Sequence, residues 1–399
     1  MAARMISFDE ALELVRSVAK PLGRETIAVA EAAGRVLAKP VVAQINSPRS
    51  DVSAMDGYAV RSEDLESLPA VLEISGESFA GARWNGRLEP GACVRIFTGA
   101  PVPAGANRVV IQENVRRDGG LAIIEEAPET ALHIRKQGSD FSAGEELLAA
   151  GRLLNPQAIV AAVSADLDKL EVYRRPRLTI LSTGDELAEP GTARAKVDAI
   201  PESVSFGLAA LACQWGATCM SRMRLGDDLP SMQSAAASAI DLADLIVVTG
   251  GASVGEKDFA KAMFEPLGLN LIFSKVSIKP GKPVWLGHAR EKLVVGLPGN
   301  PTSALVTARL LLVPLLAGMT GQPVQRALAW RTAPLAEPLG ACGPRETFHR
   351  ARWRDGTAEL LSFQDSSAQK ALAEADLLVR QHANTPGVTA GDLVEVLIF

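Results

Sequence analysis

Three short apolar runs in the middle of the chain each end in a turn that contains glycine. The runs and their turns are 178–181 with 182–186, 245–248 with 249–255, and 293–295 with 296–303. Glycine lets backbone N–H groups come close to an anion, and open α/β sheets bind ligands at such turns, beyond the carboxyl ends of their strands. One turn alone is also typical of an ordinary connection. The three together predict one shared site for an anionic, phosphorylated small molecule.

The residues predicted to bind the ligand on these turns offer backbone N–H groups, hydroxyls or a helix start. They are Thr183, Gly184, Gly250, Gly251, Ser253, Gly255, Pro298, Gly299, Asn300, Pro301 and Ser303. Asn300 followed by Pro301 has the residue types of a helix N-cap and first turn. The turn at 250–255 has the glycine spacing of a Walker A loop, but Glu256 stands where that loop has lysine. No Gly-x-Gly-x-x-Gly follows a strand, so ATPase and dehydrogenase activities are poorly supported.

Acidic residues stand beside the glycine turns. They are Asp185, Glu186, Asp227, Asp228 and Asp258. Carboxylates near phosphates usually hold hydrated Mg²⁺, which takes one or two protein carboxylates together with phosphate oxygens. Each acid taken singly is also typical of a helix cap or a surface charge. We expect a divalent cation, Mg²⁺, with Asp185, Glu186, Asp227 and Asp258 as the candidate ligands and catalytic acids.

Three lysines, Lys275, Lys279 and Lys282, surround a Pro280-Gly281 turn. Such a turn is also found at a solvated hairpin end. However, prolines on both sides of the glycine stiffen the backbone, and rigidly held ammonium groups bind oxyanions as point charges. We therefore include the three lysines among the predicted substrate-binding residues.

The other residue types that carry chemistry form no further site. The four histidines are unpaired in sequence, the four cysteines show no Cys-x-x-Cys pair, and no Gly-x-Ser-x-Gly elbow is present. The net charge of −5 argues against a nucleic-acid partner. No uninterrupted apolar run approaches the roughly 20 residues of a membrane span. We expect a cytoplasmic protein with reduced thiols that binds no nucleic acid and no membrane.

The elements that must position these residues change in character along the chain. Ser7 and Glu10 form a capping-box pattern before an amphipathic helix, and a short helix is expected after Asn155-Pro156. From Arg177 to about Thr320, apolar strands alternate with helical segments, which indicates a doubly wound, mostly parallel α/β sheet. The stretches before and after it have the short, β-branched runs of all-β units.

The resulting fold class is a multidomain protein with α/β and all-β parts. Residues 1–50 and 141–172 are expected to form a discontinuous N-terminal α/β domain, in which the first helix packs with the segment at 141–170. Residues 51–140 are expected to form a small β-domain, 173–325 the central α/β domain, and 326–399 a C-terminal domain resembling a β-barrel.

Taken in order, several motifs resemble the molybdopterin molybdenumtransferase family, which comprises the MoeA proteins and the E domain of gephyrin. The motifs are AMDGYA (54–59), FTGAPVP (97–103), GSD (138–140), TGDEL (183–187), GGASVG (250–255) with Asp258, KPGKP (279–283), GLPGNP (296–301), RETFHR (345–350) and QDSS (364–367). The resemblance covers essentially the whole chain.

The resemblance implies a four-domain homodimer in which the partner subunit completes the cleft. The implied reaction inserts molybdate into adenylylated molybdopterin and releases AMP, with a divalent cation, usually Mg²⁺. The adenylyltransferase of the preceding step is a further candidate partner. The resemblance adds Asp56 and Asp140 to the catalytic candidates and Thr98, Arg345, Arg350 and Ser366 to the substrate-binding ones.

One segment departs from the family pattern. Where the family usually carries Asp-Ser/Thr-Asn, this chain has Glu202-Ser203-Val204. Val204 lacks the hydrogen-bonding groups of an amide, and a lost hydrogen bond to a ligand typically costs about 1 kcal/mol. Val204 therefore keeps open a catalytically weakened binding or scaffold homologue. A molybdopterin adenylyltransferase is the other alternative, because proteins of that step resemble the same α/β domain and its Gly-Gly-x-x-x-Gly turn. The sequence does not discriminate molybdate from tungstate as substrate.

Overall fold

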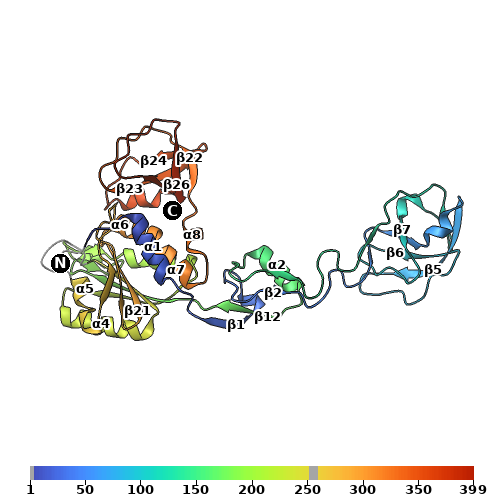
Figure 1. Cartoon of the computed structure of the whole chain (residues 1–399), viewed down its shortest axis with the longest axis horizontal. Coiled ribbons are helices and arrows are strands. Elements are labelled where there is room, and N and C mark those ends of the chain that lie inside the picture. Colours follow the sequence, from blue (N-terminus) through green and yellow to red (C-terminus); the bar gives the residue numbers. More distant parts are fainter. Residues whose placement is uncertain (1–3, 251–258) are drawn as a thin grey trace.

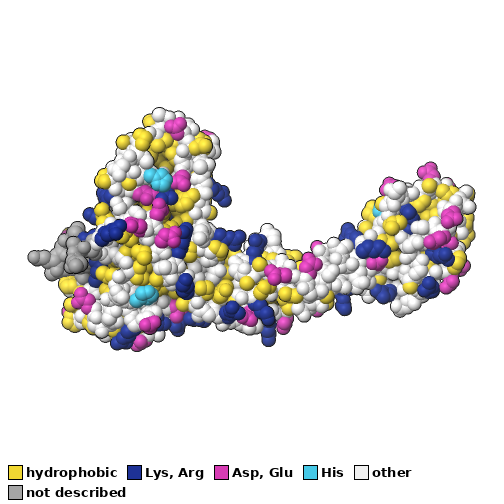
Figure 2. All heavy atoms as spheres, in the orientation of Figure 1, with side chains coloured by type: hydrophobic (Ala, Val, Ile, Leu, Met, Phe, Trp, Pro, Cys, Tyr) yellow, Lys and Arg dark blue, Asp and Glu magenta, His cyan; other side chains and the backbone are white. Residues whose placement is uncertain are grey.

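The computed structural model describes residues 4–250 and 259–399. The described chain forms four units, which we name the α/β unit, the C-terminal β-unit, the connecting unit and the inserted β-unit. In Figure 1 the α/β unit and the C-terminal β-unit lie together at one end of an elongated molecule, and the inserted β-unit lies at the other end. Acidic and basic side chains are interspersed over the face shown in Figure 2.

The α/β unit is built on a six-stranded mixed sheet. Its spatial order is β16 (Thr218–Leu225), β13 (Arg177–Thr183), β17 (Leu245–Thr249), β21 (Lys292–Leu297), β20 (Trp285–Ala289) and β18 (Asn270–Phe273). The first four strands are parallel to one another, whereas β20 and β18 run antiparallel. The three apolar runs predicted as strands are adjacent in this sheet, so their carboxyl ends meet at one edge.

Helices cover both faces of this sheet because the central strands are apolar on both sides. One face packs against α1 (Phe8–Val18), α3 (Val204–Gln214) and a continuous helix made of α6 (Pro301–Thr307), a π-helical turn (Ala308–Leu312) and α7 (Val313–Met319). The other face packs against α4 (Leu229–Leu242) and α5 (Phe259–Ala262). The pair β14 (Leu187–Ala188) and β15 (Ile200–Pro201) lies in the loop before α3.

The helix Pro301–Met319 is long and apolar enough to cross a membrane, but 94% of its most apolar window is buried inside the protein. It is the core helix of the α/β unit. Its one basic side chain, Arg309, is buried and donates hydrogen bonds to the carbonyls of Ile398 and Ala327. Burial lowers the pKa of Arg309 to about 10.

The connecting unit joins two distant stretches of chain. Strand β1 (Arg24–Ala28) pairs with β12 (Lys169–Tyr173), and β2 (Val41–Val42) pairs with β11 (Glu146–Leu148). Helix α2 (Pro156–Ser164) begins where predicted, with the Asn155 side chain accepting a hydrogen bond from the Ala158 N–H.

Helix α1 lies elsewhere than expected. Its predicted capping box is present, but its apolar stripe packs against the core of the α/β unit and not against residues 141–170. The Phe8 ring meets the edge of the Phe348 ring at 5.1 Å between centroids. An apolar stripe specifies that a helix must be buried and does not specify its partner, so this packing prediction was wrong.

The inserted β-unit is joined to the connecting unit by two segments of the chain that lie side by side. Its sheet has the order β7 (Arg108–Ile111), β4 (Gly57–Val60), β6 (Ala92–Ile96), β5 (Ala70–Ser78), β9 (Leu121–Ile124) and β8 (Arg116–Asp118), and β3 (Val52–Ser53) pairs with β10 (Ile134–Arg135). These two segments are held together where the Ser47 N–H donates a hydrogen bond to the Phe141 carbonyl at 2.9 Å.

The C-terminal β-unit contains a strand from outside the predicted range. Its sheet has the order β19 (Ile278–Lys279), β23 (Glu346–Arg354), β25 (Leu377–Gln381), β26 (Leu393–Ile398) and β22 (Arg331–Pro334), and β24 (Thr357–Leu360) pairs with β23. A bridge between Leu335 and Ala358 links the end of β22 to β24. The short helices α8 (Val324–Ala327) and α9 (Gln369–Ala373) complete this end of the chain. The mixed sheets confirm a multidomain fold, and the four domain boundaries stay predictions.

An ion cluster anchors the amino end of β13. The carboxylate of Asp244, only 5% exposed, accepts hydrogen bonds from the backbone N–H and guanidinium of Arg177 and from Arg174, and lies 3.6 Å from Lys292 Nζ. Burial alone would raise the pKa of Asp244, but the hydrogen bonds from Arg177 and Arg174 lower it well below its ordinary value of 3.8.

We expect Asp244→Asn to lower the free energy of unfolding by about 2 kcal/mol at neutral pH. A depressed carboxyl pKa stabilises the fold above the ordinary pKa, and this contribution is lost as the pH falls through the folded-state pKa. The difference between the variant and the parent should therefore narrow below about pH 4. Urea unfolding over a pH series measures it, with the exposed Asp241→Asn on α4 as control. An equal loss in both variants would contradict the assignment.

Candidate functional site

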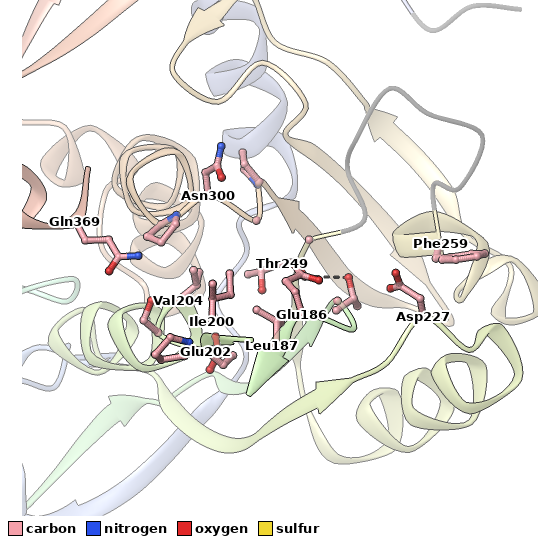
Figure 3. Close-up of a pocket in the computed structure, with 18 of the residues that line it drawn as sticks. Glu186, Leu187, Ile200, Glu202, Val204, Asp227, Thr249, Phe259, Asn300 and Gln369 are labelled. Atoms are coloured by element: carbon pink, nitrogen blue, oxygen red, sulfur yellow. Dashed lines mark hydrogen bonds between the residues drawn. The ribbon is translucent and has the colours of Figure 1, made fainter. Parts of the chain in front are cut away.

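A cavity of about 530 Å³ opens at the carboxyl edge of the parallel strands, next to the start of α6. Its walls come from the turns after β13, β16, β17 and β21, from the loop before α3, from Phe259 and Pro283, and from one residue of the C-terminal β-unit. Figure 3 shows Asp227 and Glu202 toward opposite ends of it, with Thr249 between them. The described lining consists of Thr183, Gly184, Glu186, Leu187, Ile200, Pro201, Glu202, Ser203, Val204, Asp227, Thr249, Gly250, Phe259, Pro283, Pro298, Gly299, Asn300, Pro301 and Gln369.

The three glycine turns meet in this cavity, as the sequence predicted. A Cβ on Gly250 would lie 2.3 Å from the Thr183 carbonyl oxygen, and a Cβ on Gly299 would lie 3.2 Å from the Gly250 Cα. Gly250 also has a φ of +87°, which side chains rarely adopt. Only glycine fits at the contact between the first two turns, so the backbone reaches the cavity wall without an intervening side chain.

We expect Gly250→Ala to weaken ligand binding by about tenfold or more, because the new methyl group must push the Thr183 turn away from Gly250. Gly268→Ala is the matched control, since Gly268 has a φ of +74° but nothing within 4 Å of the added Cβ. The control should cost about 1 kcal/mol of stability and leave binding unchanged. Calorimetric titration with AMP compares the two variants, and equal affinities would contradict the role given to this turn.

Carboxylates occupy one end of the cavity. Glu186 and Asp227 both line it, and the Glu186 carboxylate lies over Gly184, where a Cβ would be 2.5 Å from Oε2. Asp185 is exposed, and its Oδ1 accepts a hydrogen bond from the Asp227 N–H at 3.0 Å. Asp185 therefore holds the loop that presents Asp227. Asp228 lies just beyond and caps α4 through the Ser231 N–H.

The charged side chains among the described residues that line the cavity are all acidic. Among its described lining residues are three carboxylates, those of Glu186, Glu202 and Asp227, and no lysine or arginine. No group of three or more metal-ligating side chains occurs in residues 4–250 and 259–399. Mg²⁺ needs only one or two carboxylates when phosphate oxygens complete its shell. Glu186 and Asp227 fit that requirement.

The start of α6 forms another wall and is tied to the C-terminal β-unit. Asn300 stands at the N-cap position before Pro301, as predicted, but its side chain makes no capping bond. Its Nδ2 donates instead to Ser366 Oγ at 3.1 Å. Ser303 is buried in the first turn of α6, behind this wall.

Arg350 is buried and does not line the cavity. Its guanidinium donates to the carbonyls of Phe363 and Asp365 at 3.1 Å and to Thr302 Oγ1 at 3.4 Å. Burial lowers its pKa. Arg350 thus joins the loop that carries Ser366 to the start of α6, which places it behind the wall.

The lysines of the Pro280-Gly281 turn lie apart from the cavity, although Pro283 lines it. Lys279 and Arg345 line a second cavity of about 290 Å³ in the C-terminal β-unit, together with Cys342 and His349. Burial lowers the pKa of His349, and Lys279 lowers it further. Lys282 is exposed at the turn and Lys275 is half-buried.

Asp56 and Thr98 lie on the inserted β-unit, which Figure 1 shows at the far end of the molecule from the α/β unit that carries the cavity. Asp56 Oδ1 accepts hydrogen bonds from the Thr98 N–H at 2.7 Å and from its hydroxyl at 2.8 Å. These two bonds lower the pKa of Asp56, the backbone bond more than the hydroxyl bond. Asp140 is exposed at the junction with the connecting unit, where its N–H donates to Ser47. Within a single chain, Asp56, Thr98 and Asp140 therefore do not line the cavity.

Four predicted site residues, Gly251, Ser253, Gly255 and Asp258, lie outside the described residues. Conversely, sequence reasoning assigned no binding role to several residues that line the cavity, among them Glu202, Thr249 and Gln369. Glu202 was noted only as a departure from a motif. Thr249 is the first residue of the predicted turn 249–255, which was a usable signal, and the structure makes it the last residue of β17. Gln369 comes from another unit, and no local pattern marks it.

Comparison with known proteins identifies relatives of the whole chain. Family models match it in three stretches, described as MoeA N-terminal region (domain I and II) over residues 6–165, probable molybdopterin binding domain over 179–318 and MoeA C-terminal region (domain IV) over 332–399. A molybdopterin molybdenumtransferase of Haemophilus influenzae is 32% identical, covering 99% of both chains. Molybdopterin molybdenumtransferase 2 of Mycobacterium tuberculosis is 33% identical, covering 98% of this chain and 99% of its own.

A solved structure resembles the whole fold. The crystal structure of the molybdopterin biosynthesis MoeA protein of Pyrococcus horikosii has a TM-score of 0.85 and 28% sequence identity, and the match covers 99% of both chains. Since these matches extend over all four units, they include the N-terminal and C-terminal parts that flank the α/β unit.

Proposed function

Because this chain belongs to the MoeA family, all three of whose regions it carries, we propose that it is a molybdopterin molybdenumtransferase, which inserts molybdate into adenylylated molybdopterin and releases AMP. The observation that carries the proposal is the meeting of three glycine turns and two exposed acids in one cavity. A phosphorylated ligand with a bound cation matches that lining. The matches on both sides of the α/β unit favour this reaction over the preceding adenylyl transfer.

In this proposal, the backbone of the turns at Gly184, Gly250 and Gly299 binds the phosphates, and the start of α6 completes the wall. Glu186 and Asp227 would hold Mg²⁺, and Asp185 orients the Asp227 loop through the bond from the Asp227 N–H. Bound Mg²⁺ would neutralise phosphate charge and assist departure of AMP. Gln369 lines the cavity from the C-terminal β-unit, and the bond between Asn300 and Ser366 joins that unit to the start of α6.

The inserted β-unit suggests that a second copy of the chain completes the site. Asp56 and Thr98 carry the motifs of the family but lie far from the cavity of their own chain. A homodimer in which each inserted β-unit reaches the cavity of its partner supplies them. The four unpaired thiols suit a reducing compartment, and we place the reaction in the cytoplasm.

The direct test incubates the purified protein with adenylylated molybdopterin, molybdate and Mg²⁺. We expect stoichiometric release of AMP with no consumption of ATP. Consumption of ATP in the presence of molybdopterin would instead identify the adenylyltransferase, and removal of Mg²⁺ with a chelator should stop AMP release.

A second candidate function, a binding or scaffold protein without turnover, is favoured by one observation. Val204 places a buried apolar side chain in the cavity lining where the family usually has asparagine. If the chain fails to restore molybdoenzyme activity in cells lacking the transferase, and Val204→Asn restores it, this second function is supported. Restoration by the parent chain excludes it.

A further inference from the structure

The acidic side chain of Glu202 lies in the cavity wall and is only 6% exposed. It stands between β15 and α3, in the segment that departs from the family motif. A buried carboxylate is costly unless donors satisfy it. The hydrogen-bond donors to the Glu202 carboxylate therefore indicate its structural role.

Three hydrogen bonds connect Glu202 to two elements. Its Oε1 accepts from the Ser205 N–H at 2.8 Å and from Ser182 Oγ at 3.2 Å, and its Oε2 accepts from Ser205 Oγ at 2.5 Å. Ser205 belongs to the first turn of α3, whereas Ser182 lies next to Thr183 near the end of β13. One carboxylate thus ties the start of a helix to the edge of the sheet.

The connection continues to the neighbouring strand. Thr249, the last residue of β17, donates from Oγ1 to Ser182 Oγ at 3.2 Å, and its carbonyl accepts from Thr183 Oγ1 at 3.2 Å. Gly250 follows at once. The buried chain from Ser205 through Glu202 and Ser182 to Thr249 therefore ends beside two of the three glycine turns.

The length of the glutamate side chain suits this role. Ser203, at the N-cap of α3, makes no side-chain capping bond, and Glu202 caps the Ser205 N–H from the preceding position. Aspartate is one methylene shorter and would not reach both α3 and β13. The three bonds all run into the wall, so little of the carboxylate is left to face a ligand.

We propose that Glu202 is a positioning residue that fixes the β13 and β17 turns relative to α3, and that it does not touch the reacting atoms. This inference rests on the proposed function for its kinetic readout but not for its structural one. Glu202→Ala should loosen both turns and raise the KM for adenylylated molybdopterin by about tenfold, with kcat within about threefold of the parent.

Hydrogen exchange followed by mass spectrometry supplies the structural readout. In Glu202→Ala, exchange should rise in residues 203–208 and also in the segments that end β13 and β17. A capping residue with no further role would raise exchange in 203–208 alone, and that result would overturn the proposal. Glu189→Ala is the control, because Glu189 is an exposed glutamate in the same loop whose side chain is absent from the cavity lining.

Two conservative variants separate geometry from charge. Glu202→Gln keeps an acceptor for the Ser205 N–H and an amide NH₂ that donates to Ser205 Oγ, so its KM should stay within about threefold of the parent. Glu202→Asp should lose the bond to Ser182 and resemble Glu202→Ala in the β13 segment. A Gln variant as impaired as the Ala variant, or a fall in kcat with unchanged KM, would overturn the positioning role. If the parent chain released no AMP, the proposed function would be refuted. Hydrogen exchange alone would then test the positioning role of Glu202.

Discussion

Replacing Glu186 or Asp227 by the corresponding amide should lower the rate of AMP release by about 10²-fold or more and leave the free energy of unfolding nearly unchanged. Both side chains line the cavity and are exposed, so neither supports the core. The amides keep the shape of the acids but remove the charge that would hold Mg²⁺. Single-turnover AMP release, measured across a Mg²⁺ titration, gives both the rate and the apparent metal affinity.

The matched control for the two amide variants is Asp198→Asn, an exposed acid in the loop between β14 and β15 that does not line the cavity. It should retain full activity. The half-saturating Mg²⁺ concentration should rise in Glu186→Gln and Asp227→Asn and stay constant in the control. A variant pair with normal rates and normal Mg²⁺ dependence would remove both residues from the metal site.

A mixture of two inactive chains should recover activity if the partner subunit supplies Asp56. Asp56→Asn removes charge on the inserted β-unit, and Glu186→Gln removes it in the cavity, so each variant alone should lose about 10²-fold or more in rate. Random co-assembly makes about half of the dimers mixed, and each mixed dimer has one intact composite site out of two. Co-expressed chains should therefore show about a quarter of the parent activity.

Two outcomes distinguish the possible arrangements in that mixing experiment. If each site were built from a single chain, every site in the mixture would carry one defect and no activity would return. Pairing Glu186→Gln with Asp227→Asn provides the control, because both residues lie in the same cavity and cannot complement each other. Light scattering on the same samples measures the oligomeric state directly, and a monomer would contradict the homodimer.

Local patterns in the sequence predicted those parts of the fold that depend on neighbouring residues. Three of the four parallel strands, β13, β17 and β21, contain the predicted apolar runs, whereas β16 is half-exposed and carries no such run. The starts of α1 and α2 are marked by Ser7 and Asn155. The packing of α1 against the α/β unit was missed because its partners lie about 300 residues away in α7 and around Phe348. Strand β19 was also missed. Its partner β23 lies about 70 residues further along the chain, and a strand of two residues shows no periodicity.

The candidate site divides in a similar way. The glycine turns after β13, β17 and β21 meet as predicted, because parallel strands bring their carboxyl ends to one edge. Of the predicted acids, Glu186 and Asp227 line the same cavity and Asp185 does not. The position of Arg350 behind the wall could not be predicted, because the same guanidinium donors bind either a ligand or backbone carbonyls, and here they bind the carbonyls of Phe363 and Asp365. In the sequence Glu202 stands out only as a departure from a motif, because its serine partners are set by the packing of α3 against β13.

The two segments that meet at Ser47 and Phe141 have a consequence for the evolution of this architecture. A domain whose two ends lie side by side can be removed, replaced or enlarged without changing the path of the rest of the chain. The roughly ninety residues between them could be exchanged for a short loop and still leave the strand pairs β1–β12 and β2–β11 intact. The inserted β-unit and the strand pairs of the connecting unit are thus encoded in separate stretches of the gene, and selection can alter one while the other stays constant.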